Sequence, residues 1–380
     1  MGPLQGVKVL ELAGLGPGPF CGMMLADMGA DVVRVDRASG DANVIDIPSR
    51  FDIPSRNKRS IAIDLKSPAG VEMVLRLVET ADVLIEPYRP GVAERLGIGP
   101  DVCAARNPKL VYGRVTGWGQ TGPLSRAVGH DLNYVALSGA LHAMGDPQLP
   151  PPPPLNLVGD YGGGAMYLGF GIVCALLEAR GSGRGQVIDA AMLDGAVSMM
   201  SVVCGYTQAG IWNEQRGTNL LDGAAPFYAA YETSDGRYVT VAPIEPRFYD
   251  ELVRLLGIDA GDQYDRAAWP ERKRLLAKLF YTRTLAEWDE LLAGSDACYA
   301  PVLPLAEAPN HPHNAERGTF QSHFGVVQPT PAPRLSRTAG DIRTPPPEIG
   351  GQSREIMAEW GVTLADADAA IETGCVVQRA

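Results

Sequence analysis

Residues 7–12 (VKVLEL) are followed by the turn GLGPGP at 14–19, by the apolar segment FCGMMLADM at 20–28 and by ADVVRVD at 30–36. The first and last segments are short and rich in apolar or β-branched residues, which predicts strands. The segment between them is closed by Gly29 and predicts a helix. Strand, helix and strand in this order form a βαβ unit, so the predicted fold class is α/β.

The same alternation continues through the first third of the chain. Short apolar segments at 60–64, 81–85 and 110–115 predict further strands, and 67–79 predicts a helix among them. Strands that are joined through helices lie parallel in one sheet. The sequence therefore predicts a large domain with a Rossmann-like parallel sheet.

Proline and glycine divide the rest of the chain. Residues 147–154 contain six prolines, which excludes a helix or a central strand. Alternating residues on both sides of Asp235 and Gly236 predict a β-hairpin, with helices after it. The expected organisation is a large α/β domain over 1–190, a linker helix over 191–219, a small α+β domain over 220–325 and a C-terminal segment over 326–380 that returns to the large domain.

Composition limits the classes of partner. The chain of 380 residues has 46% hydrophobic residues and a formal net charge of −11, which argues against a nucleic acid because phosphates need a basic surface. Its six cysteines form no CxxC pair, which predicts reduced thiols and no metal site. The N-terminus has no secretory signal pattern, and the apolar run at 170–177 is too short to cross a bilayer. We expect a cytoplasmic protein without a membrane partner.

Two segments carry the residues best suited to proton transfer. GHDLNY at 129–134 contains His130, and NLVGDYGGG at 156–164 places Asp160 before three glycines. A histidine and a carboxylate are the usual general acids and bases of enzymes, and glycines permit a ligand to approach helix amides. From the residues alone, His130 could equally be a core histidine and Asp160 a helix cap.

The turn at 14–19 and the cationic residues after the predicted strands indicate a second kind of site. The turn resembles a dinucleotide fingerprint, but Pro19 stands where the third glycine is required, which disfavours a nicotinamide cofactor. Arginine and lysine residues gather after strands, where open α/β sheets bind ligands, and guanidinium groups suit phosphates. Solvated surface charges and a purely structural turn remain alternatives.

Several motifs together resemble a known family. YRPG at 88–91, GWGQTGP at 117–123, VGD at 158–160 and GRGQ at 183–186 resemble the family III CoA-transferases, also called CaiB/BaiF-like proteins. Within that family, GHD at 129–131, NLVGD at 156–160 and IEP at 244–246 resemble the α-methylacyl-CoA racemase branch. The resemblance extends to about residue 340.

The resemblance implies a two-domain protomer, and two protomers that interlock as a homodimer. His130 and Asp160 would be the acid/base residues, and Glu245 of the partner subunit would orient His130. The expected supporting residues are Asn156, Asp131, Tyr134 and Gly162. Coenzyme A would be part of the substrate rather than a cofactor, and it would lie along Leu15, Arg37, Ile63, Lys66, Arg89 and Arg95 in the large domain.

The activity that the resemblance implies is interconversion of (2R)- and (2S)-2-methylacyl-CoA thioesters through an enolate. One group on each face of Cα would remove and return the proton, and the Asp160 amide would stabilise the enolate oxygen. Branched fatty acids and sterol side chains both carry such thioesters, and nothing in the sequence selects among them. The alternatives are a CoA-transferase with Asp160 as nucleophile and a non-enzymatic acyl-CoA binding protein.

Overall fold

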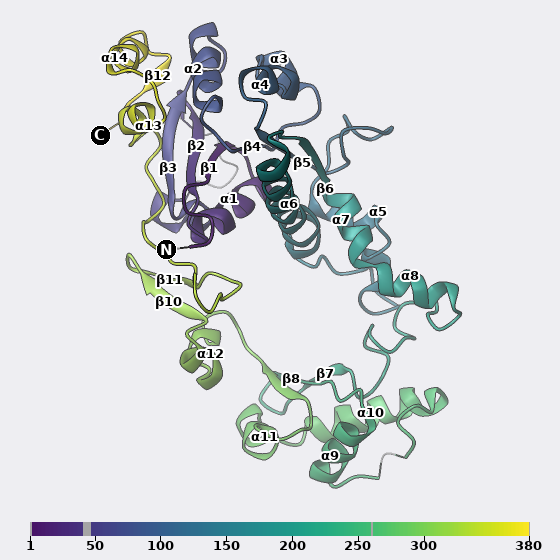
Figure 1. Ribbon diagram of the computed structural model, residues 1–380. Helices are drawn as coiled ribbons and strands as arrows, with labels where there is room; N and C mark the ends of the chain where they lie inside the picture. Colours follow the sequence, from purple (N-terminus) through teal and green to yellow (C-terminus); the bar gives the residue numbers. More distant parts are fainter. Residues whose placement is uncertain (1, 41–46, 260, 380) are drawn as a thin grey trace. The chain divides into compact units, whose positions relative to one another are not determined.

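The computed structural model describes residues 2–40, 47–259 and 261–379 (Figure 1). The chain divides into two compact units. The first consists of Met1–Ser138, Pro154–Met199 and Gly318–Ala380, and the second of Gly139–Pro153 and Met200–Arg317.

The first unit contains a seven-stranded sheet in the order β12-β3-β2-β1-β4-β5-β6. All neighbours are parallel except β12, which is antiparallel to β3. The strands are β1 (Lys8–Leu12), β2 (Asp31–Arg37), β3 (Lys58–Ile63), β4 (Val83–Glu86), β5 (Val111–Thr116), β6 (Val187–Ala191) and β12 (Val376–Val377). The order 3-2-1-4-5-6 is that of the Rossmann fold, so the α/β class and the large parallel sheet predicted from the sequence are confirmed.

Helix α1 (Pro17–Asp27) begins three residues before the start predicted from the sequence. Pro17 is its first residue, and a proline suits that position because its φ is preset and its missing N–H would have no partner there. Gly16 precedes it with a positive φ of 69°, a backbone conformation that favours glycine. The turn after β1 therefore leads directly into the helix.

Successive strand residues bury their side chains on opposite faces of this sheet. Leu10, Val33 and Leu84 belong to one apolar cluster, with residues of α2 (Pro68–Val78) and the C-terminal segment. Val9, Val32 and Val83 belong to the other, with residues of α1 and α6 (Tyr167–Ser182). Both faces are thus covered, as continuous apolar strands require. The remaining helices near the sheet are α3 (Val92–Leu96), α4 (Pro100–Arg106), α5 (Asp131–Leu137) and α7 (Met192–Met199), with the short turns η1 (Ser49–Phe51) and η2 (Ile53–Ser55).

The C-terminal residues pack in the first unit. Helices α13 (Ser353–Glu359) and α14 (Leu364–Glu372) lie beside β3 and β12 (Figure 1). The Trp360 indole donates a hydrogen bond to Asp31 Oδ2 at 2.9 Å, and Asn57 Nδ2 donates to the backbone carbonyl of Asp341 at 2.8 Å. The hairpin of β10 (Phe320–His323) and β11 (Val326–Pro329) precedes them.

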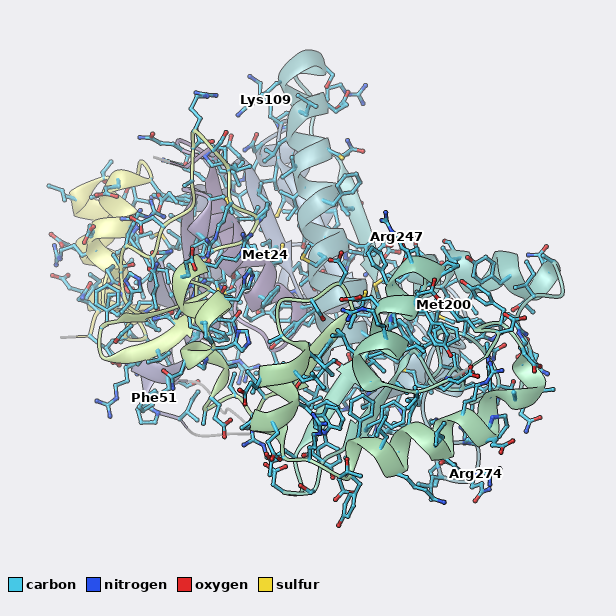
Figure 2. The ribbon with its side chains drawn as sticks, turned by 90° about the horizontal axis from the view of Figure 1, so that it is seen from below. Met24, Phe51, Lys109, Met200, Arg247 and Arg274 are labelled. Atoms are coloured by element: carbon cyan, nitrogen blue, oxygen red, sulfur yellow. The ribbon has the colours of Figure 1, made fainter. Side chains whose placement is uncertain are left out.

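A long helix follows the proline-rich segment. A π-helix, η4 (Leu157–Met166), continues without a break into α6. By length and composition alone, the whole span Leu157–Ser182 is long and apolar enough to cross a membrane. This corrects the expectation that the apolar stretch, taken as 170–177, is too short to do so. Its inner face packs against the sheet: a Cβ added to Gly113 of β5 would lie 2.8 Å from Leu168 and 3.6 Å from Ile172. Met24 of α1, labelled in Figure 2, reaches the same helix, within 3.4 Å of a Cβ added to Gly169.

The second unit is built on a three-stranded antiparallel sheet of β7 (Ala229–Glu232), β8 (Tyr238–Val241) and β9 (Tyr299–Val302). Gly236 turns the β7–β8 hairpin with a φ of 71°, which confirms the hairpin predicted there. Its core includes Tyr231, Phe280 and Trp288, whose rings pack together. The helices of this unit are α8 (Ser201–Gln208), α9 (Pro246–Leu256), α10 (Trp269–Phe280), α11 (Leu285–Leu292) and α12 (Pro312–Arg317), with the turns η3 (Leu141–Ala143), η5 (Arg266–Ala268) and η6 (Ala308–Asn310).

Candidate active site

His130 is the residue immediately before α5, and its side chain is exposed. Its backbone N–H donates to Asn133 Oδ1 at 3.1 Å. The Tyr134 hydroxyl donates to the carbonyl of Gly129, and the Tyr134 ring packs edge-on against Trp118 with centroids 4.7 Å apart. The first turn of α5 therefore holds the histidine loop in place, and the alternative of a core histidine is wrong.

Asp160 lies in the first turn of η4, where it is half-buried. The N–H of Tyr161 bonds to the carbonyl of Asn156, five residues earlier, at 3.2 Å, which is the bond of a π-helix. Asn156 occupies the N-cap position, so the alternative of Asp160 as helix cap is wrong. Asn156 instead donates through Nδ2 to Asp160 Oδ2 at 3.4 Å. Such π-helical turns are rare in proteins overall, and those that occur often lie at functional sites.

The backbone amide of Asp160 is already engaged. It donates to Asp131 Oδ1 at 2.6 Å, so it is not available as the oxyanion donor expected from the sequence. The amides of Asp131 and Leu132, the first two residues of α5, have no acceptor among the described residues. Because helix N-termini leave such amides unpaired and carry partial positive charge, these two are better placed to meet an anion.

Burial and neighbouring charges shift the pKa values of Asp160 and Tyr134. Burial raises the pKa of the Asp160 carboxyl above its ordinary 3.8, and the negative charge of Asp131 adds to this. The hydrogen bond from Asn156 and the charge of His130 act in the opposite direction. Burial also raises the pKa of Tyr134 to about 12, so its hydroxyl stays a donor at neutral pH.

The glycines of this region are explained by close packing of helices. A Cβ on Gly16 would lie 2.8 Å from Asp160 Oδ2. A Cβ on Gly163 would lie 2.6 Å from the carbonyl oxygen of Met192 in α7, and one on Gly162 3.1 Å from Met199 Cε. The glycines after Asp160 thus admit α7, rather than leaving room for a ligand as the sequence suggested.

The residues expected to bind coenzyme A fall into two groups. Leu15, Arg37, Lys66, Arg89 and Arg95 are exposed, and the first four of them follow or end β1, β2, β3 and β4. Carboxyl ends of parallel strands form one edge of a sheet, so the structure brings these residues to the edge where such folds bind ligands. The four cations form no ion pair with a described residue. Ile63 differs, because it is 1% exposed within β3, and its side chain belongs to the core.

Glu245 lies in the second unit, directly before α9, and is exposed. Its carbonyl accepts the amides of Phe248 and Tyr249. The neighbouring carbonyl of Ile244 accepts hydrogen bonds from Gln263 Nε2 at 2.9 Å and from the Tyr264 hydroxyl at 2.6 Å. These hydrogen bonds fix the backbone at the start of α9, and the Glu245 side chain is exposed beside them. Arg247, two residues further on, is labelled in Figure 2.

Sequence reasoning missed two contacts of the Asp160 segment. Gly16 approaches its carboxylate, and Phe20 stacks on Tyr161 with ring centroids 4.4 Å apart. Gly16 directly precedes α1 and Phe20 lies within it, in a region where the sequence left open a ligand-binding turn and a purely structural one. Only the close approach of α1 to η4 shows that the turn also borders Asp160.

Comparisons with known proteins show the family of this chain. The model of CoA-transferase family III matches residues 4–353. The chain is similar to the alpha-methylacyl-CoA racemase of Mus musculus, with 46% identity covering 94% of this chain and 93% of that one. It is 44% identical to the protein of that name in Homo sapiens, with coverage of 94% and 93%. A CAIB/BAIF family protein from Brucella suis has a similar structure, with a TM-score of 0.81 and 28% identity over 94% of this chain and 99% of that one. The chain belongs to CoA-transferase family III, which confirms the family predicted from its motifs.

Proposed function

We propose that this protein is an enzyme that interconverts (2R)- and (2S)-2-methylacyl-CoA thioesters. The observation that carries the proposal is that one side chain, Asp131, joins the segments of two proton carriers of different type. His130 precedes α5, and the next residue, Asp131, holds the backbone of Asp160 at 2.6 Å. The similarity to mammalian racemases over 94% of the chain supports the same conclusion.

The residue types suit inversion at a carbon next to a carbonyl. Each face of Cα needs one group, and the group that removes the proton differs from the one that returns it. A carboxylate with a raised pKa is a stronger base than an ordinary one, so burial of Asp160 favours proton abstraction. His130 would serve the opposite face, and the partner's Glu245 would orient it.

A thioester α-proton is too weakly acidic for either base without stabilisation of the enolate. We assign this role to the amides of Asp131 and Leu132, which directly follow His130 at the start of α5, where the Asp131 side chain accepts the backbone N–H of Asp160. A single well-placed donor lowers such a barrier by about 3–4 kcal/mol. The thioester oxygen would therefore lie over the first turn of α5.

Isotope exchange tests the proposal and separates it from its alternatives. The protein is incubated with (2R)-2-methyldecanoyl-CoA in deuterated water, and epimerisation and deuterium at Cα are followed together. A racemase produces both, whereas no exchange at Cα would overturn the proposal. Transfer of coenzyme A to a free acid, lost in Asp160→Ala and kept in His130→Ala, would identify a transferase. Saturable binding without either reaction would identify a binding protein.

The rate of exchange should depend on pH through Asp160. For the epimer whose proton Asp160 removes, only the ionised carboxylate acts as base, so the rate falls as pH is lowered through the pKa of this group. Since burial raises that pKa, the acid limb should lie above pH 3.8. Initial rates across a pH series, with folding checked by circular dichroism at each pH, would measure it. A limb at or below 3.8 would contradict the assignment.

Gly16→Ala should reduce exchange by roughly tenfold or more, since a misplacement of about 1 Å at a reacting group can cost 10²-fold. A methyl group there would lie 2.8 Å from Asp160 Oδ2, and the φ of 69° is unfavourable for alanine. The matched control is Gly6→Ala, which also has a positive φ, of 86°, but has no atom within 4 Å of the added Cβ. Steady-state rates of both purified variants decide the matter, and equal losses would contradict a specific effect on Asp160.

We further propose that the protein acts as a homodimer. The continuous helix of η4 and α6 exposes an apolar row: Met166, at the end of η4, and Phe170, Val173 and Leu177 of α6 are 52%, 73%, 46% and 72% exposed. Their spacing of four, three and four residues places them on one helix face. Apolar surface of this extent is typical of an interface. A second copy suits it better than a bilayer, because the other face of the helix packs in the core of the first unit.

Paired variants test both the dimer and the origin of Glu245. If each site uses the partner's Glu245, His130→Ala and Glu245→Gln are each inactive alone. A heterodimer of the two keeps one intact site and should have about half of the wild-type activity, so random mixing of equal amounts should restore about a quarter. Analytical ultracentrifugation would report the dimer, and flotation with lipid vesicles would report a membrane partner instead. No restoration in a verified heterodimer would contradict the shared site.

A further inference from the structure

We propose that Asp131 is a positioning residue that fixes the spacing of His130 and Asp160, an inference that rests on the proposed racemase function. Asp131 directly follows His130 and is the first residue of α5. Its Oδ1 accepts the backbone N–H of Asp160, 29 residues later in the chain. One side chain therefore connects the two segments that carry the proton carriers.

Burying the Asp131 carboxylate costs folding free energy, and the position of Asp131 in the first turn of α5 does not require that burial. The residue is 8% exposed, and its Oδ2 has no partner among the described residues. An acidic residue in a first turn stabilises a helix while its oxygen atoms stay in water, as Asp101 of α4 does. A buried carboxylate with an unsatisfied oxygen lowers stability instead. We therefore expect Asp131 to have a functional role.

The chain makes room for this carboxylate at one position. A Cβ added to Gly159 would lie 2.4 Å from Asp131 Oδ1 and 2.9 Å from its Cγ. The φ of Gly159 is not positive, so its backbone would accept other residues. Close approach of the carboxylate, rather than backbone conformation, is what requires glycine here.

Two bases that act on opposite faces of one carbon tolerate little error in their separation. Productive geometry must be held within about 0.5 Å. A hydrogen bond of 2.6 Å between the α5 start and the η4 backbone supplies such a constraint. The negative charge of Asp131 also contributes to the raised pKa of Asp160, in agreement with this arrangement.

The experiment compares Asp131→Ala, Asp131→Asn and Gly159→Ala, with Asp101→Asn as a control that removes an exposed first-turn carboxylate. Rates are measured from both epimers of 2-methyldecanoyl-CoA, and folding is checked by thermal melting. For Asp131→Ala we expect kcat to fall about 10–100-fold in both directions while KM changes less than about threefold. Asp131→Asn keeps an acceptor oxygen and should stay within about fivefold of the wild type.

Gly159→Ala leaves the carboxylate in the chain but displaces it, so it should lose kcat like Asp131→Ala. The double variant should be no slower than Asp131→Ala alone, because both changes break one contact. Wild-type kcat in a folded Asp131→Ala or Gly159→Ala protein would overturn the inference, and so would an asparagine variant as slow as the alanine variant. If the wild-type protein itself shows no exchange, the proposed function is overturned. That outcome is distinct from the two above, which concern only the variants.

Discussion

Asp160→Asn is expected to lower epimerisation of a 2-methylacyl-CoA by roughly 10²–10⁴-fold, the usual contribution of a positioned acid or base. The amide has nearly the same shape but cannot carry the proton. Deuterium exchange at Cα should be lost chiefly for the epimer whose proton Asp160 removes. Exchange rates from each pure epimer, followed by mass spectrometry, would measure the effect.

The fold should survive this change. Because the pKa of Asp160 is raised in the folded state, folding favours the protonated carboxyl, and stability decreases as pH rises from the unfolded value of 3.8 through the folded value. Asparagine resembles the protonated form, so the melting temperature at neutral pH should be unchanged or higher. His130→Ala should give the opposite epimer preference. Equal losses of exchange from both epimers would contradict one residue for each face.

Lys58→Met is expected to reduce the free energy of unfolding by about 3–5 kcal/mol, because it leaves a buried charge without its partner. The ammonium of Lys58 lies 2.8 and 2.7 Å from the two carboxylate oxygens of Glu11, and it donates to the carbonyl of Pro19 at 2.9 Å. Both side chains are 0% exposed. Urea unfolding followed by circular dichroism would measure the loss.

Two further variants show whether the pair or the lysine alone is responsible. Burial raises the pKa of Glu11 and lowers that of Lys58, so each group depends on the other for its charge. Glu11→Gln combined with Lys58→Met should therefore be more stable than Lys58→Met. The exposed pair of Arg254 and Glu251 is the control, and Arg254→Met should leave the unfolding midpoint unchanged. A double variant less stable than the single one would contradict this account.

The local pattern of residue types was sufficient to predict most of the strands and helices. The apolar strand at Lys8–Leu12 and the β-branched strand at Asp31–Arg37 lie where their composition predicted. The hairpin at Gly236 could be predicted because a positive φ there favours glycine. In each case the decisive residues are neighbours in the chain, so the sequence contains the whole signal.

Contacts between distant segments could not be predicted in this way. Strand β12 pairs with β3 across more than 300 residues, and its two residues are too few to produce a pattern. The burial of Ile63 depends on α2 and the C-terminal segment, which cover its face of the sheet. The helix begins at Leu157 with Asn156, rather than Asp160, in the N-cap position, and no periodicity of residue types indicated the π-helical turns there.

For the candidate site, the sequence by itself determined the chemistry: which residues can carry protons, which segments bear them, and which family their motifs belong to. Only the tertiary structure decided how these groups are arranged. The Asp160 amide is held by Asp131 and not left for an enolate, and the glycines beside it serve helix packing. The reason is physical, since residue type limits which bonds a group can form, whereas the approach of α5, α1 and α7 to η4 decides which bonds form.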